Sequence, residues 1–268
     1  MKSFHCACGQ RVFFDSTSCI SCGRALGFDP ETRDMVALGS AWRLCTNGRN
    51  YDVCNWVVPA AGPARYCEAC ALNDLIPSLD TPDNVQLWGR VEAAKRRLLY
   101  TLLSLGLPLT AGSAGPALRF RFMEDRRRNP LVLEDFVGTG HWAGVITINI
   151  READDVARTA DREAMQERYR TVLGHFRHES GHYYFNVLVT GEEIARWREL
   201  FGDEQADYAA TLEAYYRDGP PLNWSQRYVS TYAAAHPYED WAETFAHYLH
   251  IVDALETALV NAGVLEQD

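Results

Sequence analysis

The sequence predicts an α+β fold in which a small cysteine-rich module precedes a mostly helical domain with a short β-sheet. Three observations predict it. All eight cysteines fall within the first 70 of the 268 residues. Between residues 118 and 150, short runs alternate apolar with polar residues, as half-buried strands do. From residue 151 onward, apolar residues recur mainly at three- and four-residue steps, as in amphipathic helices.

Length and composition limit the possible architectures. With 47% hydrophobic residues, the chain can bury one sizeable core and a smaller one. We assign the cysteine-rich module to residues 1–78 and the larger domain to residues 79–268, with residues 77–84 as the linker. The formal net charge of −10 lacks the basic footprint of a nucleic-acid binder, so no nucleic-acid partner is expected.

The expected compartment is the cytoplasm. The sequence opens without the charged and apolar regions of a secretory signal. Its most apolar run, residues 98–109, is too short to cross a bilayer, so no membrane partner is expected. In a reducing compartment, clustered cysteines bind metal rather than form disulfides. Four disulfides in a secreted module is the competing interpretation, and no export signal supports it.

The cysteine spacing predicts two structural zinc sites. Two close cysteine pairs, each followed by a glycine, can form two tight turns that meet around one tetrahedral Zn²⁺. The remaining four cysteines are more loosely spaced. We expect sequential sites made by Cys6, Cys8, Cys19 and Cys22 and by Cys45, Cys54, Cys67 and Cys70, although the spacing leaves interleaved ligation open. Because such a small module has little apolar core, zinc binding would supply its folding energy.

Charge in the module is balanced. Seven basic and seven acidic side chains precede residue 79, so no basic stripe is available for nucleic acid. A protein partner or substrate is the better prediction for this module, and a purely structural role is the alternative.

The first part of the larger domain predicts one helix and three strands. Thr81 can cap a helix that begins at Pro82, and an apolar stripe continues to Gly106. The strand-like runs are residues 118–122, 131–137 and 144–150. A turn is expected at residues 139–142. Its His141 could contact substrate or metal, although a lone histidine on a loop usually does neither.

The rest of the chain is predicted to be mainly helical. The expected helices are residues 154–166, 169–187, 192–201 and 204–217. Two consecutive prolines at 220 and 221 break this run. Pro237 then fits the first turn of a final helix.

The segment His178-Glu179-Ser180-Gly181-His182 predicts a metal site on the central helix. Positions i and i+4 lie one turn apart on the same helix face, so both histidines can bind one ion. Glu179 stands beside them and could hold a water against that ion, the arrangement of zinc peptidases. Glycine inside a helix costs about 1 kcal/mol, so we expect close packing at Gly181. A buried helix with two chance histidines is the alternative.

Two acidic residues on the final helix are candidates to complete this site. A catalytic zinc needs a third protein ligand and one open position. Glu239 and Glu243 lie one turn apart, so both could face the metal-binding helix. Glu243 is suited to accept the second N–H of a ligand histidine. The alternatives are two solvated acids, or a role for Asp240, whose side chain should fall away from the pair.

The histidine motif and the final helix together resemble the gluzincin metallopeptidases, particularly their lethal-factor-like branch. The second matching segment is Glu239-Asp-Trp-Ala-Glu243. The resemblance implies that Glu239 is the third zinc ligand and that Glu243 supports a ligand histidine from outside the coordination sphere. It also implies that Tyr232, seven residues before Glu239, donates to the oxyanion of the reaction.

Nearly the whole chain also resembles the bacterial family called "putative zinc-binding metallopeptidases", in which a zinc ribbon precedes the peptidase domain. The matching segments are Cys6-Ala-Cys8-Gly9, residues 173–182 and residues 239–250. Members of that family run longer at the carboxyl end. The resemblance implies a zinc ribbon at residues 1–78 and a gluzincin-like peptidase domain at residues 79–268.

The expected function is zinc-dependent hydrolysis of peptide bonds in a peptide or protein substrate. One catalytic zinc would activate a water for which Glu179 is the general base, and two further zincs would be structural. The strand at residues 144–150 precedes the metal-binding helix as the cleft-edge strand does in gluzincins, so the resemblance implies that substrate binds to it by β-augmentation. One alternative is a zinc-ribbon adaptor that binds protein through a non-catalytic or latent peptidase-like domain, although the intact Glu179 argues against it. Hydrolysis of a non-peptide amide is another.

Overall fold

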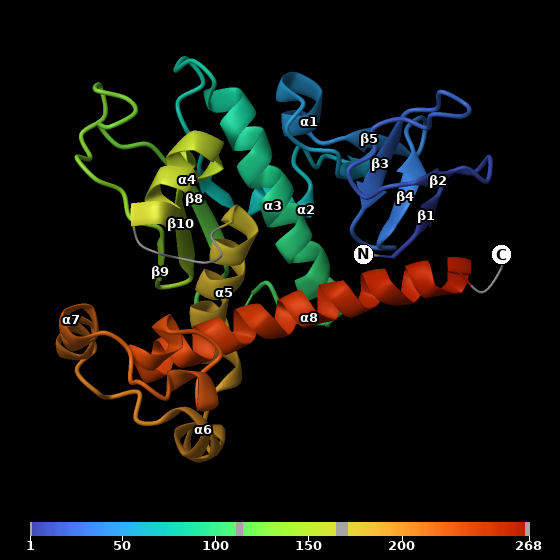
Figure 1. Ribbon diagram of the computed structural model, residues 1–268. Helices are drawn as coiled ribbons and strands as arrows, with labels where there is room; N and C mark the ends of the chain where they lie inside the picture. The colour runs from blue at the N-terminus through green and yellow to red at the C-terminus, as the bar shows by residue number, and fades with distance from the viewer. Residues whose placement is uncertain (1, 111–114, 165–170, 266–268) are drawn as a thin grey trace.

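The structure is a computed structural model that describes residues 2–110, 115–164 and 171–265. The predicted α+β class is confirmed. Figure 1 shows an amino-terminal module of short strands and a separate sheet on opposite sides of the long helix α3 (Asn84–Ser104). Within the described part of the chain, no helix has both the length and the apolar character needed to span a membrane.

Three antiparallel strand pairs and two short helices, α1 (Thr46–Tyr51) and α2 (Glu68–Ala71), build the amino-terminal module. The pairs are β1 (Phe4–His5) with β2 (Arg11–Val12), β3 (Leu26–Asp29) with β4 (Asp34–Ala37), and β5 (Trp42–Leu44) with β6 (Val57–Pro59). Phe4, Phe14 and Phe28 surround the ring of Tyr100 from α3, and the Phe14 and Tyr100 centroids are 5.4 Å apart. The module therefore shares one hydrophobic core with the larger domain.

The larger domain contains a four-stranded sheet in the order β7-β8-β10-β9. Its strands are β7 (Asn73–Leu75), β8 (Arg119–Met123), β9 (Gly140–Trp142) and β10 (Val145–Asn149). β7, β8 and β10 are parallel, and β9 runs antiparallel to β10 along one edge. The predicted strands at residues 118–122 and 144–150 correspond to β8 and β10.

Two predictions in this region are wrong. Residues 131–137 form no strand but part of a loop, which Asp125 closes by accepting hydrogen bonds from the Val137 N–H (3.2 Å) and the Asn149 amide (2.7 Å). Residues 140–142 belong to β9 rather than to a turn. Apolar alternation in a short segment cannot distinguish a strand from a loop whose polar groups are bonded to a buried carboxylate.

β7 falls within the predicted ribbon module, yet it pairs with β8 in the sheet of the larger domain. Behind it, the fully buried Lys95 of α3 forms an ion pair with Glu92 (2.8 Å). Lys95 also donates to the side chain of Asn73 in β7, whose amide donates to Glu92 (2.6 Å). Buried charges thus join α3 to the first strand of the sheet.

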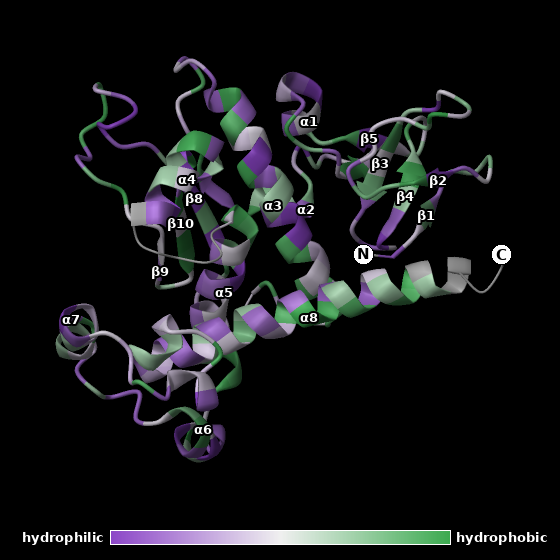
Figure 2. Cartoon of the chain, in the orientation of Figure 1, coloured by the Kyte–Doolittle hydropathy of each residue, from purple (hydrophilic) through white to green (hydrophobic). Residues whose placement is uncertain are grey.

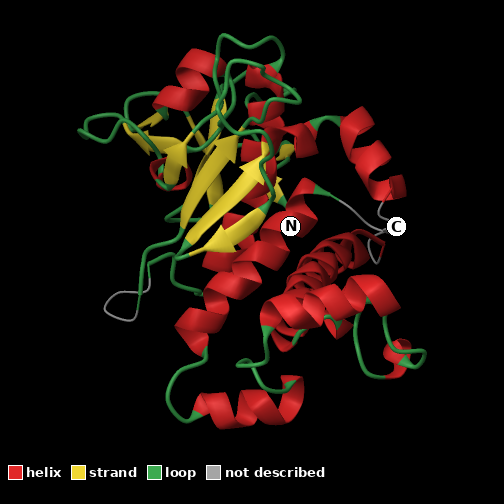
Figure 3. Cartoon of the chain, turned by 90° about the vertical axis from the view of Figure 1, so that its left-hand side faces the viewer, coloured by secondary structure: helices red, strands yellow, loops and turns green. Residues whose placement is uncertain are grey.

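Most of the chain after the sheet is helical. The helices are α4 (Asp155–Ala164), α5 (Val172–Leu188), α6 (Glu193–Phe201), α7 (Tyr208–Asp218) and α8 (Pro237–Leu265), with 3-10 segments η2 (Ile150–Ala153), η3 (Trp224–Gln226) and η4 (Tyr232–Ala234). Figure 3 shows that the half of the molecule below the sheet is built from helices. The expected helices match these, although residues 165–170 lie outside the described residues. They include the end of the helix expected at 154–166 and the start of the one expected at 169–187.

The predicted cap at Thr81 is wrong, because α3 begins at Asn84 after Asp83, whose φ is +65°.

The long helices α3 and α8 are in contact. Hydrophobic and hydrophilic residues alternate along α8 (Figure 2), and its far half extends beneath α3. There Asp253 accepts a hydrogen bond from Thr101 (2.7 Å), which fixes α8 to α3.

Candidate metal sites and catalytic cleft

The eight cysteines form two groups of four. Cys6, Cys8, Cys19 and Cys22 form the first group, and Cys45, Cys54, Cys67 and Cys70 form the second, so the arrangement is sequential rather than interleaved. Neighbouring sulfurs within the groups are 3.6 or 3.7 Å apart, and none is in a disulfide. Zn–S bonds of about 2.3 Å in a tetrahedron separate sulfurs by about 3.8 Å, whereas a disulfide needs about 2.0 Å. Both groups therefore fit zinc.

The two groups differ in burial. All four cysteines of the second group are buried, whereas Cys8 and Cys22 of the first are exposed. Arg96 of α3 is buried beside the second group and donates to the carbonyl of Val53 (2.6 Å). Burial alone would lower the pKa of Arg96, but negative charge, led by that of Cys54, raises it. The guanidinium thus offsets part of the negative charge of a zinc ion with four thiolates.

Helices α5 and α8 approach closely enough to bring the other candidate ligands together. Thr171 caps α5 by accepting a hydrogen bond from the Gly174 N–H (3.0 Å). Gly181 faces Ala242 of α8, and a Cβ on Gly181 would lie only 2.8 Å from the Ala242 Cα. The close packing expected at Gly181 is confirmed. Without a side chain there, the two helix backbones meet, and the first turns of α8 face the histidines of α5.

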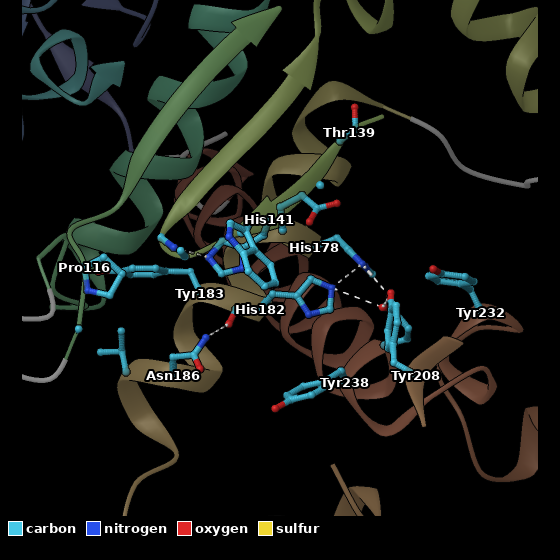
Figure 4. Close-up of a pocket in the computed structure, with 18 residues that line it drawn as sticks. Pro116, Thr139, His141, His178, His182, Tyr183, Asn186, Tyr208, Tyr232 and Tyr238 are labelled. Carbon is cyan, nitrogen blue, oxygen red and sulfur yellow. Dashed lines mark hydrogen bonds and ion pairs between the residues drawn. The ribbon is translucent and has the colours of Figure 1, made fainter. Parts of the chain in front are cut away.

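His178 and His182 lie close together at this crossing (Figure 4), and Glu239 completes a group of three candidate ligands. The His178 Nε2 is 3.1 Å from Glu239 Oε2 and 3.2 Å from the His182 Nε2. The His182 Nε2 is 3.6 Å from Glu239 Oε1. Bonds of about 2.0–2.1 Å from a tetrahedral zinc to nitrogen and oxygen separate the ligand atoms by about 3.3–3.4 Å. The three side chains therefore have the spacing of a zinc site.

One atom of this group has no hydrogen-bond partner among the described residues. Glu239 is only 1% exposed, and its Oε2 accepts no hydrogen bond from them. A buried carboxylate oxygen without a donor is costly unless it faces a cation, which here is either a protonated His178, 3.1 Å away, or a metal ion between the two side chains. Burial would raise the pKa of Glu239, but the contacts with His178 and His182 lower it well below its usual range. The donor set is thus a carboxylate oxygen and two imidazole nitrogens, which suits Zn²⁺.

Glu243 lies behind His178. Its Oε1 is 2.7 Å from the His178 Nδ1, so an N–H at Nδ1 leaves the Nε2 lone pair free for a metal. Burial would lower the pKa of His178, but Glu239 and Glu243 outweigh it and raise that pKa. Asp240 is not part of the ligand group, and burial raises its pKa to about 6.

Glu179 and Tyr232 line the same cleft, which has a volume of about 770 Å³. Burial raises the pKa of Glu179, so its carboxylate is a stronger base than an exposed one, and no hydrogen bond to it is found among the described residues. The Tyr232 ring lies 6.0 Å from the His178 ring. Burial, followed by the charge of Glu239, raises the pKa of Tyr232, so its hydroxyl keeps its proton and can donate.

Two further residues line the cleft: Tyr208, which the sequence did not single out, and His141, for which it left a contact with substrate or metal open. The Tyr208 hydroxyl, at the start of α7, donates to Glu239 Oε1 (2.7 Å). His141 lies on β9 with its ring 6.4 Å from that of His182 and nearly parallel to it, and its Nε2 accepts from the Gly144 N–H (3.1 Å). Burial and the charge of His182 lower the pKa of His141 to about 4. Neither contact follows a helical or strand period, so only the tertiary structure reveals it.

The edge of the cleft differs from the expectation. β10 is paired on both sides, with β8 and with β9, so it offers no free edge to a substrate. β9 is the outer strand of the described sheet, and all three of its residues line the cleft. The prediction that residues 144–150 form the edge is therefore wrong, because the short segment before them is a strand rather than a turn.

Comparisons with known proteins agree with this arrangement. A family model described as "Putative zinc-binding metallo-peptidase" matches residues 84–266, and a zinc-ribbon domain model matches residues 3–81. Uncharacterized proteins from two strains of Mycobacterium tuberculosis and from Mycobacterium bovis are each 44% identical over 265 residues, which cover 96% of this chain and 75% of theirs. No solved structure matches. The extent of these matches shows that this chain belongs to the family described as "Putative zinc-binding metallo-peptidase", with a zinc-ribbon domain ahead of the family's matched region.

Proposed function

We propose that this protein hydrolyses peptide bonds with one catalytic zinc and that two further zincs are structural. His178, His182 and Glu239 would hold the catalytic zinc, in a gluzincin-like arrangement. The observation that carries the proposal is the convergence of His178, His182 and Glu239, whose ligand atoms are 3.1–3.6 Å apart in the cleft that Glu179 also lines.

Glu179, Tyr232 and Glu243 each have a defined task in this reaction. Bound zinc would supply Lewis acidity, polarising the scissile carbonyl and making water more acidic. Glu179 accepts the proton of the attacking water and delivers it to the leaving amine. Tyr232 donates its hydroxyl proton in a hydrogen bond to the developing oxyanion. Glu243 orients His178 through Nδ1.

The cleft also suits an extended peptide. β9 is an open edge of the described sheet along the cleft, so a substrate strand can hydrogen-bond to its backbone. Aromatic side chains, including Tyr183 and Tyr238, line the walls and provide apolar contacts for substrate side chains. These features support a peptide or protein substrate over a small amide. The eight cysteines, none in a disulfide, support a reducing compartment such as the cytoplasm.

Replacing Glu179 by alanine tests the proposal. The variant should keep the zinc content of the wild type and lose about 10²- to 10⁴-fold in the rate of cleavage of a peptide and protein panel. Exposed Glu199 on α6, replaced by alanine, is the control and should be fully active. Metal analysis should find three zincs per wild-type chain and two after His178→Ala/His182→Ala. Turnover by Glu179→Ala above about a tenth of the wild-type rate would contradict the assignment.

Protein binding by the ribbon is the second candidate. Phe13 and Ile20 are 69% and 88% exposed near the first cysteine group and provide an apolar surface for a partner. A metal-loaded wild type that cleaves nothing in the panel would favour this adaptor function. Glu179 lines the open cleft and can act as a base, so hydrolysis is the first candidate and protein binding the second.

A further inference from the structure

Tyr208 makes a contact that the proposed reaction does not use. Its hydroxyl donates to Oε1 of Glu239 at 2.7 Å, whereas Oε2 of the same carboxylate accepts no hydrogen bond from the described part of the chain. The two oxygens of one ligand candidate are therefore not equivalent. A carboxylate can bind zinc through one oxygen or both, and a donor on one oxygen favours binding through the other.

We infer that Tyr208 is a positioning residue that makes Glu239 a one-oxygen ligand, with Oε2 as the ligand atom. The inference rests on the zinc site proposed above. Oε2 faces the His178 Nε2 at 3.1 Å, whereas Oε1 is farther from the His182 Nε2, at 3.6 Å. A one-oxygen ligand leaves a tetrahedral site with an open fourth position for water, which hydrolysis requires.

Hydrogen bonds of His236 connect the loop before α7 to the start of α8, and this connection holds Tyr208 near Glu239. His236, buried just before α8, accepts from the Tyr238 N–H at Nδ1 (3.0 Å) and donates from Nε2 to the carbonyl of Ala206 (3.1 Å). The ring of Tyr208 packs edge-on against that of His236, with centroids 5.1 Å apart. The same histidine therefore anchors both the first turn of the ligand helix and the segment that delivers the hydroxyl.

α7 itself contributes little to the core. None of its residues is buried, and Tyr208 is 44% exposed. Removing one hydroxyl from this helix should therefore leave the fold intact. Any change in metal binding would then report on the contact with Glu239 rather than on global unfolding.

Replacing Tyr208 by phenylalanine tests the inference, because it removes the hydroxyl and keeps the ring against His236. We expect the affinity of the catalytic site for zinc, measured by chelator competition without substrate, to fall about 10- to 100-fold. In cobalt-substituted protein, the visible absorption should weaken as Glu239 becomes free to bind through both oxygens. Tyr248→Phe is the control, because Tyr248 is 51% exposed and lies on the same helix as Glu239.

Three results would overturn the inference. They are an unchanged affinity and cobalt spectrum in Tyr208→Phe, an equal loss in Tyr248→Phe, and the loss of the two cysteine-bound zincs along with the third. The proposed hydrolysis fails separately: a wild type that binds the third zinc but cleaves no peptide refutes that reaction and leaves the role of Tyr208 standing.

Discussion

Replacing Gly181 by alanine would test whether the contact between α5 and α8 holds the metal ligands together. Gly181 lies between His178 and His182, and its Cα faces the backbone of Ala242. A Cβ there would stand 2.8 Å from the Ala242 Cα and 3.3 Å from the Phe245 Cβ. Carbon atoms in ordinary contact are about 3.5–4.0 Å apart, so the helices would have to separate by about 1 Å.

Two opposing effects set the change in stability. Overpacking of this kind costs about 1–3 kcal/mol. Alanine is the better helix former by about 1 kcal/mol, so the net destabilisation is about 0–2 kcal/mol. The effect on the metal site is larger, because zinc ligands must be correct to within about 0.2 Å, and Glu239 lies on the helix that moves. We therefore expect Gly181→Ala to lose the catalytic zinc and keep the two cysteine-bound zincs.

Gly89 on α3 provides a matched control. A Cβ on Gly89 would meet the Val53 Cγ1 at 3.5 Å, an ordinary contact, so Gly89→Ala should be neutral or more stable by up to about 1 kcal/mol. Zinc per chain by mass spectrometry and the midpoint of thermal unfolding would be measured for both variants. If Gly181→Ala kept all its zinc and gained stability as Gly89→Ala does, the helices would not meet as the structure has them, and the reasoning would be refuted.

Two further predictions concern the ribbon and its junction with the sheet. Lys95→Met should lower the free energy of unfolding, measured in urea, by about 3–5 kcal/mol, because it leaves the buried carboxylate of Glu92 without its cation. Replacing both Lys95 and Glu92 by apolar residues should recover most of the loss. A double variant as unstable as Lys95→Met would contradict this. Cys45→Ser should remove the zinc of the second cysteine group. It should also lower the unfolding temperature more than Cys8→Ser does, because Cys45 is fully buried and Cys8 is exposed. Equal effects on the unfolding temperature would show that burial does not distinguish the two sites.

Local patterns in the sequence predict much of the candidate site. His178 and His182 are one helical turn apart, so the period of a helix alone places them on one face. The cysteine pairs lie on tight turns, and their spacing alone indicates zinc. The assignment of Glu239 as a ligand beside the histidines of α5 needs the resemblance to a known family. The reason is that 57 residues (239 − 182) separate it from His182, and no local rule spans that distance.

The parts that sequence reasoning misses depend on distant contacts. β9 is only three residues long, and its identity as a strand comes from pairing with β10 rather than from its composition. The segment at residues 131–137 has strand-like alternation, but the buried carboxylate of Asp125 binds its end and keeps it a loop. Tyr208 reaches Glu239 across 31 residues of sequence, and a tyrosine at the first position of an exposed helix carries no signal of that contact.

The second cysteine group and the candidate cleft belong to one continuous packed unit. β7 begins three residues after Cys70 (73 − 70). It is one edge of the four-stranded sheet, in which β8 and β10 connect it to the cleft strand β9 at the other edge. Arg96, on the helix that lies behind this sheet, is buried beside the same cysteines. Displacement of the second group would therefore move the sheet edge that a substrate would bind. Among the described strands, those of the first group, β1 and β2, pair only with each other, so this group reaches the larger domain through side-chain packing, as between Phe4 and Tyr100, and not through the sheet.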